Sequence, residues 1–342
     1  MSWRSIRTAS GAPVVLGAII VAIIVGALDV LPVHSQALQL EALRATAPVP
    51  LDDPWDVVWD AAPRQDVAMS KQNIAPPFGG GTIETLIARA LHNSDRLYLL
   101  LEWEDDNLDD AVNGVAEFSD AIAVQFPAAS IDALPPFTMG GAGAPVNIWQ
   151  WKAVWQADID SGFTTIRTRY PNTLVDFYPG GDDPQAAKSP LLFKTAQYVG
   201  NPLAQREHDS PIENLIAEGF GTLTNSDVQD VVGRGTWREG RWRALFSRQL
   251  EPVSEDQASF TVGDSTNIAF AVWDGGSGNR NGQKSIAAFI ELAVGPGETA
   301  VREFGGAQLL IALVIGVTLF AVVSIGTFRY TRAQRAGGHG TS

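Results

Sequence analysis

A methionine in a glycine-rich loop is the residue of this chain best suited to cofactor chemistry. Met139 is one of three methionines, the initiator included, and it lies in the segment Phe137-Thr-Met-Gly-Gly-Ala-Gly-Ala-Pro145. Glycines let a backbone approach a large flat ligand closely, and a thioether can bind soft or borderline iron. The tryptophan-rich stretch Val-Asn-Ile-Trp-Gln-Trp follows directly and includes Trp149 and Trp151. The segment therefore permits a thioether metal ligand just before a β-strand, although a lone methionine in a loop is more often a packing residue.

A second stretch near the end of the chain completes a recognisable pattern. It reads Asn279-Arg-Asn-Gly-Gln-Lys-Ser285 and follows Asn267-Ile-Ala-Phe-Ala-Val-Trp-Asp-Gly275. With the methionine segment, it resembles the haem b subunit, often called gamma, of type II molybdoenzymes of the DMSO reductase family, such as ethylbenzene dehydrogenase and dimethylsulfide dehydrogenase. The similarity runs, with gaps, from about residue 51 to 294. This chain differs from the soluble members of that family, because they lack a C-terminal anchor. We therefore expect a membrane-anchored variant.

The resemblance implies a site and a function. Met139 and Lys284 would be the axial ligands of a non-covalent haem b, with Gly140, Asn147 and Trp149 in the cofactor-binding site. A haem with two axial ligands transfers electrons and leaves no open position for substrate. The implied partners are a molybdenum catalytic subunit and an iron–sulfur subunit, with a quinone or a cytochrome as electron partner.

Other residues compete for these roles. Met69 lacks the Val-Asn-Ile-Trp context of Met139, so we expect it in a pocket or at the surface. Lys152 is the rival amine, and the parity of its strand predicts the polar face opposite the tryptophans, at solvent or a sheet edge. The histidines are scattered and offer poor ligands by position: His34, His92, His208 and His339.

Several kinds of chemistry are excluded or disfavoured. The chain has no cysteine, which rules out disulfides, thiolate metal sites, iron–sulfur clusters and covalently attached c-type haem. The pattern shows no Ser/His/Asp set or paired carboxylates. The acidic stretches Glu102–Asp110 and Gly180–Asp183 could bind calcium, but their spacing fits no EF-hand loop, and we expect solvated loops there.

The hydrophobic pattern predicts an all-β fold. Short apolar runs with period-2 alternation are separated by Gly, Pro, Asn and Asp, as in an antiparallel β-sandwich of the immunoglobulin-like or DOMON-like type. Residues 160–235 read as a long irregular insertion. The predicted strands are 96–103, 121–126, 242–250, 259–262, 266–273 and 285–294, with another in which Trp149, Trp151, Ala153, Trp155 and Ala157 share a face.

Two apolar runs flank the predicted domain. Residues 14–28 follow Arg4 and Arg7, and residues 307–328 are long enough to span a bilayer and precede three arginines. The positive-inside rule puts both ends in the cytoplasm and the domain on the extracytoplasmic side of the cell membrane. We expect these parts: an anchor or signal peptide at 1–33, a linker at 34–50, an exported haem-binding domain at 51–304, a transmembrane helix at 305–328 and a cytoplasmic tail at 329–342.

The charge distribution bears on partners. Residues 34–304 hold 37 of the 38 acidic residues and 19 of the 24 basic residues, a net charge of −18. This charge argues against nucleic acid and favours a partner with a basic face.

The alternative function is a membrane-tethered carbohydrate-binding module. Trp149, Trp151 and Trp155 would form its aromatic platform. Burial of this stripe in a core is the simpler interpretation, because polar residues occupy the opposite face.

Overall fold

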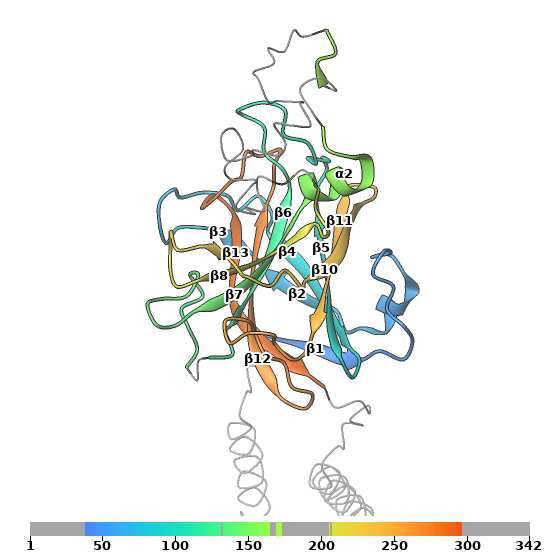
Figure 1. The fold of residues 1–342 in the computed structure, drawn as a ribbon, viewed down its shortest axis with the longest axis vertical. Coiled ribbons are helices and arrows are strands. Elements are labelled where there is room, and N and C mark those ends of the chain that lie inside the picture. Colours follow the sequence, from blue (N-terminus) through green and yellow to red (C-terminus); the bar gives the residue numbers. More distant parts are fainter. Residues whose placement is uncertain (1–37, 131–132, 165–168, 173–204, 206, 296–342) are drawn as a thin grey trace, which may run out of the picture.

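The computed structural model describes residues 38–130, 133–164, 169–172, 205 and 207–295. The two apolar terminal runs lie outside this part of the chain, as does much of the predicted insertion. In the part that is described, no helix is long and apolar enough to cross a membrane. The fold is mostly β (Figure 1), with a short 3₁₀-helix η1 (Val57–Ala61) and the α-helix α2 (Ala153–Ser161).

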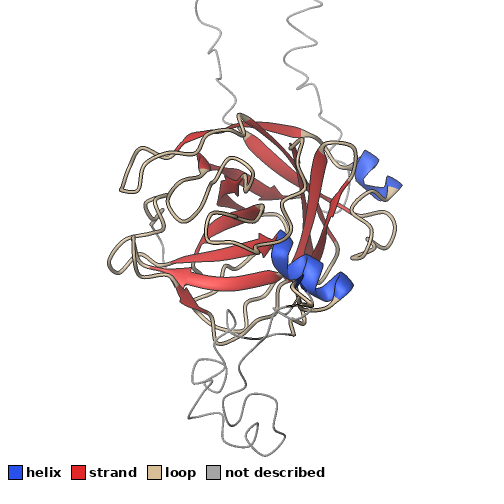
Figure 2. Ribbon diagram, turned by 90° about the horizontal axis from the view of Figure 1, so that it is seen from above, coloured by secondary structure: helices blue, strands red, loops and turns tan. Residues whose placement is uncertain are grey.

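The strands form one strongly curled sheet (Figure 2). Its order is β10-β11-β5-β4-β1-β13-β12-β6-β7-β8-β9, with β2 added to β4 and β3 to β13. The strands are β1 (Gln39–Arg44), β2 (Gln65–Ala68), β3 (Ser70–Lys71), β4 (Thr85–His92), β5 (Arg96–Glu104), β6 (Ala121–Pro127), β7 (Val146–Lys152), β8 (Ile212–Ala217), β9 (Thr224–Asn225), β10 (Val232–Trp237), β11 (Arg241–Gln249), β12 (Ser265–Trp273) and β13 (Ser285–Val294).

Strand β1 joins the two halves of the sheet and corrects two predictions. It pairs in parallel with both β13 and β4, so the sheet is not purely antiparallel. Its residues were predicted to belong to a linker, yet Leu40 and Ala42 are fully buried between the halves. The short run Gln-Leu-Glu-Ala-Leu-Arg is poor in β-branched and aromatic residues, and it therefore carries little strand signal of its own.

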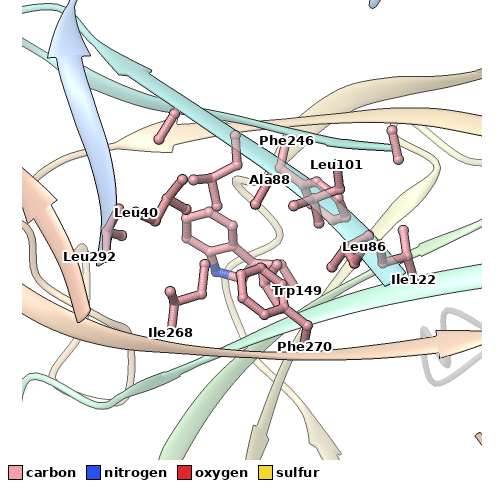
Figure 3. Close-up of a cluster of buried hydrophobic side chains, with 14 of the residues drawn as sticks. Leu40, Leu86, Ala88, Leu101, Ile122, Trp149, Phe246, Ile268, Phe270 and Leu292 are labelled. Atoms are coloured by element: carbon pink, nitrogen blue, oxygen red, sulfur yellow. The ribbon is translucent and has the colours of Figure 1, made fainter. Parts of the chain in front are cut away.

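The core lies between the two halves of the curled sheet. Trp103 of β5 and Trp242 of β11 pack against Trp151 of β7, with ring centroids 6.2 and 4.9 Å apart. Gly235 of β10 permits this packing, since a Cβ there would lie 2.0 Å from the Trp151 ring. Figure 3 shows Trp149 among aliphatic and aromatic side chains of the same core. The tryptophan-rich strand therefore supplies the core, as its alternation predicted.

The predicted strands are mostly confirmed, but the region 160–235 is not irregular throughout as predicted, because it contributes β8, β9 and the start of β10 to the sheet. The structure contains strands at the positions predicted from residues 96, 121, 242, 266 and 285 onward. Residues 259–262 are not a strand, although Phe260 donates one backbone hydrogen bond to Leu250.

The predicted tryptophan strand ends earlier than expected. Helix α2 starts at Ala153, whose N–H donates to the Asp120 carbonyl, while the Val154 N–H donates to the Ser119 hydroxyl. These bonds satisfy N–H groups that a helix start leaves without partners. Trp155 therefore leaves the sheet, and the predicted face shared with Trp149 and Trp151 ends at Lys152.

Candidate functional site

A cavity of about 710 Å³ lies on the outer face of the sheet, on the side away from the core. Such a volume is typical of pockets that bind cofactor-sized ligands, which span about 300–1,000 Å³. Strands β6, β7, β12 and β13 form its floor, and the loops around Pro76, Val115, Met139 and Arg280 form its walls. The cavity therefore gathers segments from most of the length of the described chain.

The floor of the cavity is apolar where a solvated sheet face would be polar. Its central positions are alanines on neighbouring strands, namely Ala121, Ala123, Ala269 and Ala271. Ala121, Ala123 and Ala271 belong to an outer cluster with Ile148, Leu215 and Trp273, separate from the main core. Small side chains keep this surface flat, so a planar ligand can lie against it. Strands β6 and β12 carry apolar residues on both faces. Such a continuous apolar run is the signal in the sequence that could have revealed a second buried layer.

Met139 lies at one side of this floor and has an unusual backbone. Its φ angle is +69°, a left-handed conformation that is uncommon for residues other than glycine. Its carbonyl accepts a hydrogen bond of 2.7 Å from the Gly219 N–H, and its side chain packs on the outer cluster. Gly140 follows with φ +75°, and a Cβ there would lie 2.6 Å from the Ala144 carbonyl. The loop thus holds the thioether over the floor at some conformational cost.

Lys284 enters the same cavity just before β13. Its backbone N–H donates to the Gly79 carbonyl, and its carbonyl accepts from the Gln72 N–H. Gly80 passes so close that a Cβ there would lie 2.3 Å from the Lys284 backbone nitrogen. The amine is 4.8 Å from the centroid of the Trp273 ring. Burial lowers the pKa of this amine to about 8, because the charged form loses hydration.

Met139 and Lys284 approach the cavity from opposite ends of the strands. Strands β7 and β13 run in opposite directions, since three antiparallel pairings connect them through β6 and β12. Met139 precedes the start of β7, and Lys284 precedes the start of β13. The two residues would share one edge of the sheet only if β7 and β13 were parallel. Both nevertheless line the cavity, because the loop of Met139 folds back over the floor. The two donors therefore flank the cavity rather than sharing one rim.

Lys152 also lines the cavity, which corrects its predicted position. Its strand parity is as predicted, but the face opposite the tryptophans is covered by loops instead of solvent. The Lys152 amine forms an ion pair with the buried Glu213 carboxylate and lies 3.9 Å from the Trp155 ring centroid. Burial lowers the pKa of Lys152, whereas Glu213 opposes this shift. Lys152 is thus neutralised by a partner, unlike Lys284, for which the described residues supply no ion pair.

Two predicted cofactor-binding residues do not reach the cavity. Asn147 and Trp149 are fully buried on the core side of β7. The Asn147 amide donates to the Asn214 side chain and the Leu215 carbonyl, and its oxygen accepts from Trp149 Nε1. These two residues organise the strand beneath the floor. Gly140 lies next to Met139 and shapes its loop without lining the cavity.

The remaining rivals lie elsewhere in the described structure. Met69 is 8% exposed and belongs to the core. His92 ends β4, is buried, and contacts backbone carbonyls with both ring nitrogens. His208 stacks on Trp155, with ring centroids 4.1 Å apart. His34 and His339 lie outside the described residues. Trp149 and Trp151 are core residues and offer no exposed platform for a sugar.

The donor set fits a planar, iron-containing ring. A flat apolar floor, a thioether and an amine without a carboxylate partner face one cavity, and no histidine or cysteine side chain lines it. An amine binds a metal only as the neutral base, and burial of Lys284 favours that form. The fold and site thus define a β-sheet protein with a cavity on its outer face that fits a planar ring.

The family of the chain follows from a sequence comparison. The model of the family described as ethylbenzene dehydrogenase matches residues 56–285, which is more than half of the chain and includes Met139 and Lys284. The chain therefore belongs to the ethylbenzene dehydrogenase family.

Three curated relatives are similar over much of their length. A putative respiratory nitrate reductase heme subunit of Haloferax mediterranei is 28% identical over 245 residues, covering 71% of this chain and 68% of the relative. The chlorate reductase subunit gamma of Ideonella dechloratans is 24% identical, covering 68% and 75%. The dimethylsulfide dehydrogenase subunit gamma of Rhodovulum sulfidophilum is 25% identical, covering 69% and 72%.

A comparison with solved structures found a more distant likeness. A family 9 carbohydrate-binding module from Caldicellulosiruptor kristjanssonii, in complex with glucose, has 10% identity and a TM-score of 0.37. The alignment covers 78% of this chain and 99% of the module. At this score the likeness supports no argument about function.

Proposed function

We propose that this chain is an electron-transfer subunit that carries a non-covalent haem b, with Met139 and Lys284 as its axial ligands. Bound haem would supply a reversible one-electron centre. With both axial positions filled by side chains, the centre has no open position for a substrate. The protein's part is therefore to hold the ring, exclude water and set its potential, and a methionine ligand tends to raise that potential.

The contrast between two lysines is the observation that carries the proposal. Lys152 and Lys284 line one cavity, but Lys152 is paired with Glu213 whereas Lys284 lies over the Trp273 ring. A buried ammonium without a counter-charge is unfavourable. A metal ligand role explains why such a group is retained, because the metal takes the lone pair that would otherwise hold the proton.

The relatives support the assignment of the cofactor. One similar protein is named a heme subunit and two are named gamma subunits of a reductase or a dehydrogenase. We extend this to a complex with a molybdenum catalytic subunit and an iron–sulfur subunit, with a quinone or a cytochrome as the further electron partner. We also propose that residues 34–304 face the extracytoplasmic side of the cell membrane and that the C-terminal tail is cytoplasmic. The arginines that follow residue 328 motivate this orientation.

Haem extraction from the purified full chain tests the cofactor assignment. Acid acetone should release all of the haem, because the chain has no cysteine for a thioether link. The extracted haem should amount to one per chain and should be b-type. A colourless protein from a haem-replete host, or haem that stays with the precipitated chain, would reject the proposal.

A further inference from the structure

Three buried carboxylates meet beside the cavity, and electron transfer assigns them no role. Asp105 follows β5, Asp120 precedes β6 and Asp274 follows β12. The antiparallel pairing of β6 and β12 brings the last two to one edge, since Trp273 pairs with Ala121. One oxygen from each carboxylate lies within 4.8 Å of the other two. All three residues are buried, with exposures of 7%, 0% and 8%.

No positive side chain balances these charges in the part of the chain that is described. The ion pairs of this region involve Glu102 and Glu104 with Arg241 instead. The partners of the three carboxylates are neutral N–H groups. Asp120 accepts from Gly275 N–H at 2.8 Å and from Trp242 Nε1 at 3.0 Å. These bonds orient the carboxylates toward each other but leave their mutual repulsion in place.

Oxygen atoms without hydrogen-bond partners occur on residues of these loops. Asp105 Oδ2 is buried and has no hydrogen-bond partner, and the same holds for Asn279 Oδ1 and Asp109 Oδ2. Asn279 is 4% exposed, and its N–H donates to the Asp274 carbonyl. The backbone N–H of Asp109 donates to Asp120 Oδ2 at 3.0 Å. A buried polar atom without a partner is unfavourable because it has lost its hydration, so several such atoms beside three carboxylates favour a bound cation.

The crowding of these carboxylates raises the pKa of two of them. Burial and the neighbouring Asp274 raise the pKa of Asp105 to about 6. Burial and Asp105 raise the pKa of Asp120 to about 7. Two protons or one divalent cation can relieve the same excess of negative charge. Two protons supply at most two O–H donors, whereas one cation could be bound by all three unpartnered oxygens, Asp105 Oδ2, Asp109 Oδ2 and Asn279 Oδ1.

We propose that Asp105, Asp120 and Asp274 bind one Ca²⁺ ion. The donors are all oxygens, which hard cations prefer, and the cluster offers no nitrogen or sulfur ligand for zinc or iron. Ca²⁺–oxygen distances of about 2.3–2.6 Å allow ligand oxygens to lie up to about 5 Å apart, and the three carboxylate oxygens lie within 4.8 Å of one another. The carboxylates come from three separate loops, and Asp109 and Asn279 offer further oxygens. This irregular set suits the six to eight ligands of Ca²⁺ better than the strict octahedron of Mg²⁺.

The ion would tie together one wall of the haem cavity. Asp120 and Asn279 both line the cavity, and Asp274 begins the loop that ends at Lys284. Binding of Ca²⁺ would thus order the loop that presents the amine. The site itself does not depend on haem, so its test can fail or succeed independently of the proposed function.

Calorimetric titration of the chelator-treated full chain in detergent is the test. CaCl₂ should bind with a stoichiometry of one ion per chain and raise the thermal unfolding midpoint, because a ligand that binds only the folded state stabilises it. MgCl₂ should bind at least tenfold more weakly. Asp105→Asn, Asp120→Asn and Asp274→Asn should each weaken Ca²⁺ binding by roughly tenfold or more. Asp106→Asn is the matched control, since Asp106 is exposed in the same loop.

Two results would overturn the calcium site. One is a wild-type chain that neither binds CaCl₂ nor shifts its unfolding midpoint. This result would mean that the carboxylates share protons. The other is unchanged Ca²⁺ affinity in the three asparagine variants. If a variant does not fold, the wild-type titration with CaCl₂ and MgCl₂ alone decides the question.

Discussion

At the scale of single residues, the two lysines of the cavity differ in the group that lies beside the amine. Lys152 has a carboxylate partner and Lys284 has an aromatic ring. The sequence could not distinguish these environments, because Glu213 lies 61 positions from Lys152. The resemblance of the Asn279–Ser285 segment was the signal that favoured Lys284. The same kind of signal misled for Asn147 and Trp149. Both belong to the segment that carries the resemblance, yet both lie in the core.

The pKa of Lys284 predicts a pH-dependent stability for the haem-free chain. The folded-state pKa is about 8 and the ordinary value is 10.5. Between these values the unfolded chain binds more protons, so the free energy of unfolding should rise with pH from about 8 to 10.5. Lys284→Met should flatten this rise. Denaturant titrations at pH 8 and pH 10 measure the unfolding free energy at each pH. An equal rise between the two pH values in the wild type and in Lys284→Met would contradict the buried, unpaired amine.

Trp149→Phe separates a core role from a cofactor role. The change removes the Nε1–H that bonds to Asn147 Oδ1 at 2.9 Å. The lost bond leaves a buried acceptor with fewer partners, and we expect about 1–3 kcal/mol less unfolding free energy. The haem spectrum should stay as in the wild type, because Trp149 faces away from the cavity. A changed spectrum with unchanged stability would place Trp149 in the cofactor site after all.

At the scale of elements, the alanine floor is the feature that shapes the cavity. Adjacent strands β6 and β12 place Ala123 opposite Ala271 in register. Their outward side chains would normally face solvent, and small side chains there keep room for a flat ligand. The alternation of apolar residues predicted the strands, but it could not show that loops from four parts of the chain cover their outer face.

Enlarging the floor should exclude haem without unfolding the sheet. Ala271→Leu adds three carbons at a position that is not fully buried, so we expect a loss of haem occupancy of severalfold with a small change in the unfolding midpoint. Ala288→Leu is the matched control, because Ala288 is exposed on β13 and does not line the cavity. Haem content per chain is the measurement. Equal haem content in both variants would show that haem does not bind against this floor.

Local signals explain which elements could be predicted. Strands with many β-branched or aromatic residues, such as β12, have nearly the predicted bounds. Strand β1 and helix α2 could not be found this way, because both depend on partners far away in the sequence. Strand β1 requires β4 and β13, and the start of α2 requires Ser119 and Asp120.

At the scale of the whole molecule, charge and the terminal segments predict the surroundings. The net charge of −18 between residues 34 and 304 should make association with a basic partner sensitive to salt, since charges at the surface are screened beyond about 8 Å at physiological ionic strength. Mild detergent extraction at low salt should co-purify a molybdenum subunit and an iron–sulfur subunit in equal amounts. Repeated recovery of the haem protein alone from its native membrane would count against such a complex.

The orientation in the membrane is open to a direct test. A reporter enzyme that is active only outside the cytoplasm should be inactive when fused after Ser342, because arginines follow the second apolar run. The same reporter fused after Gly297 should be active. The reverse pattern would show that the domain faces the cytoplasm.

The absorption spectrum of the purified full chain and three alanine variants tests the central claim most directly. The wild-type protein should show a low-spin haem with two axial ligands. Met139→Ala and Lys284→Ala should each give a spectrum of haem with an open or substituted position. Lys152→Ala should leave the spectrum unchanged, although Lys152 lines the same cavity. Wild-type spectra in both Met139→Ala and Lys284→Ala would contradict the account.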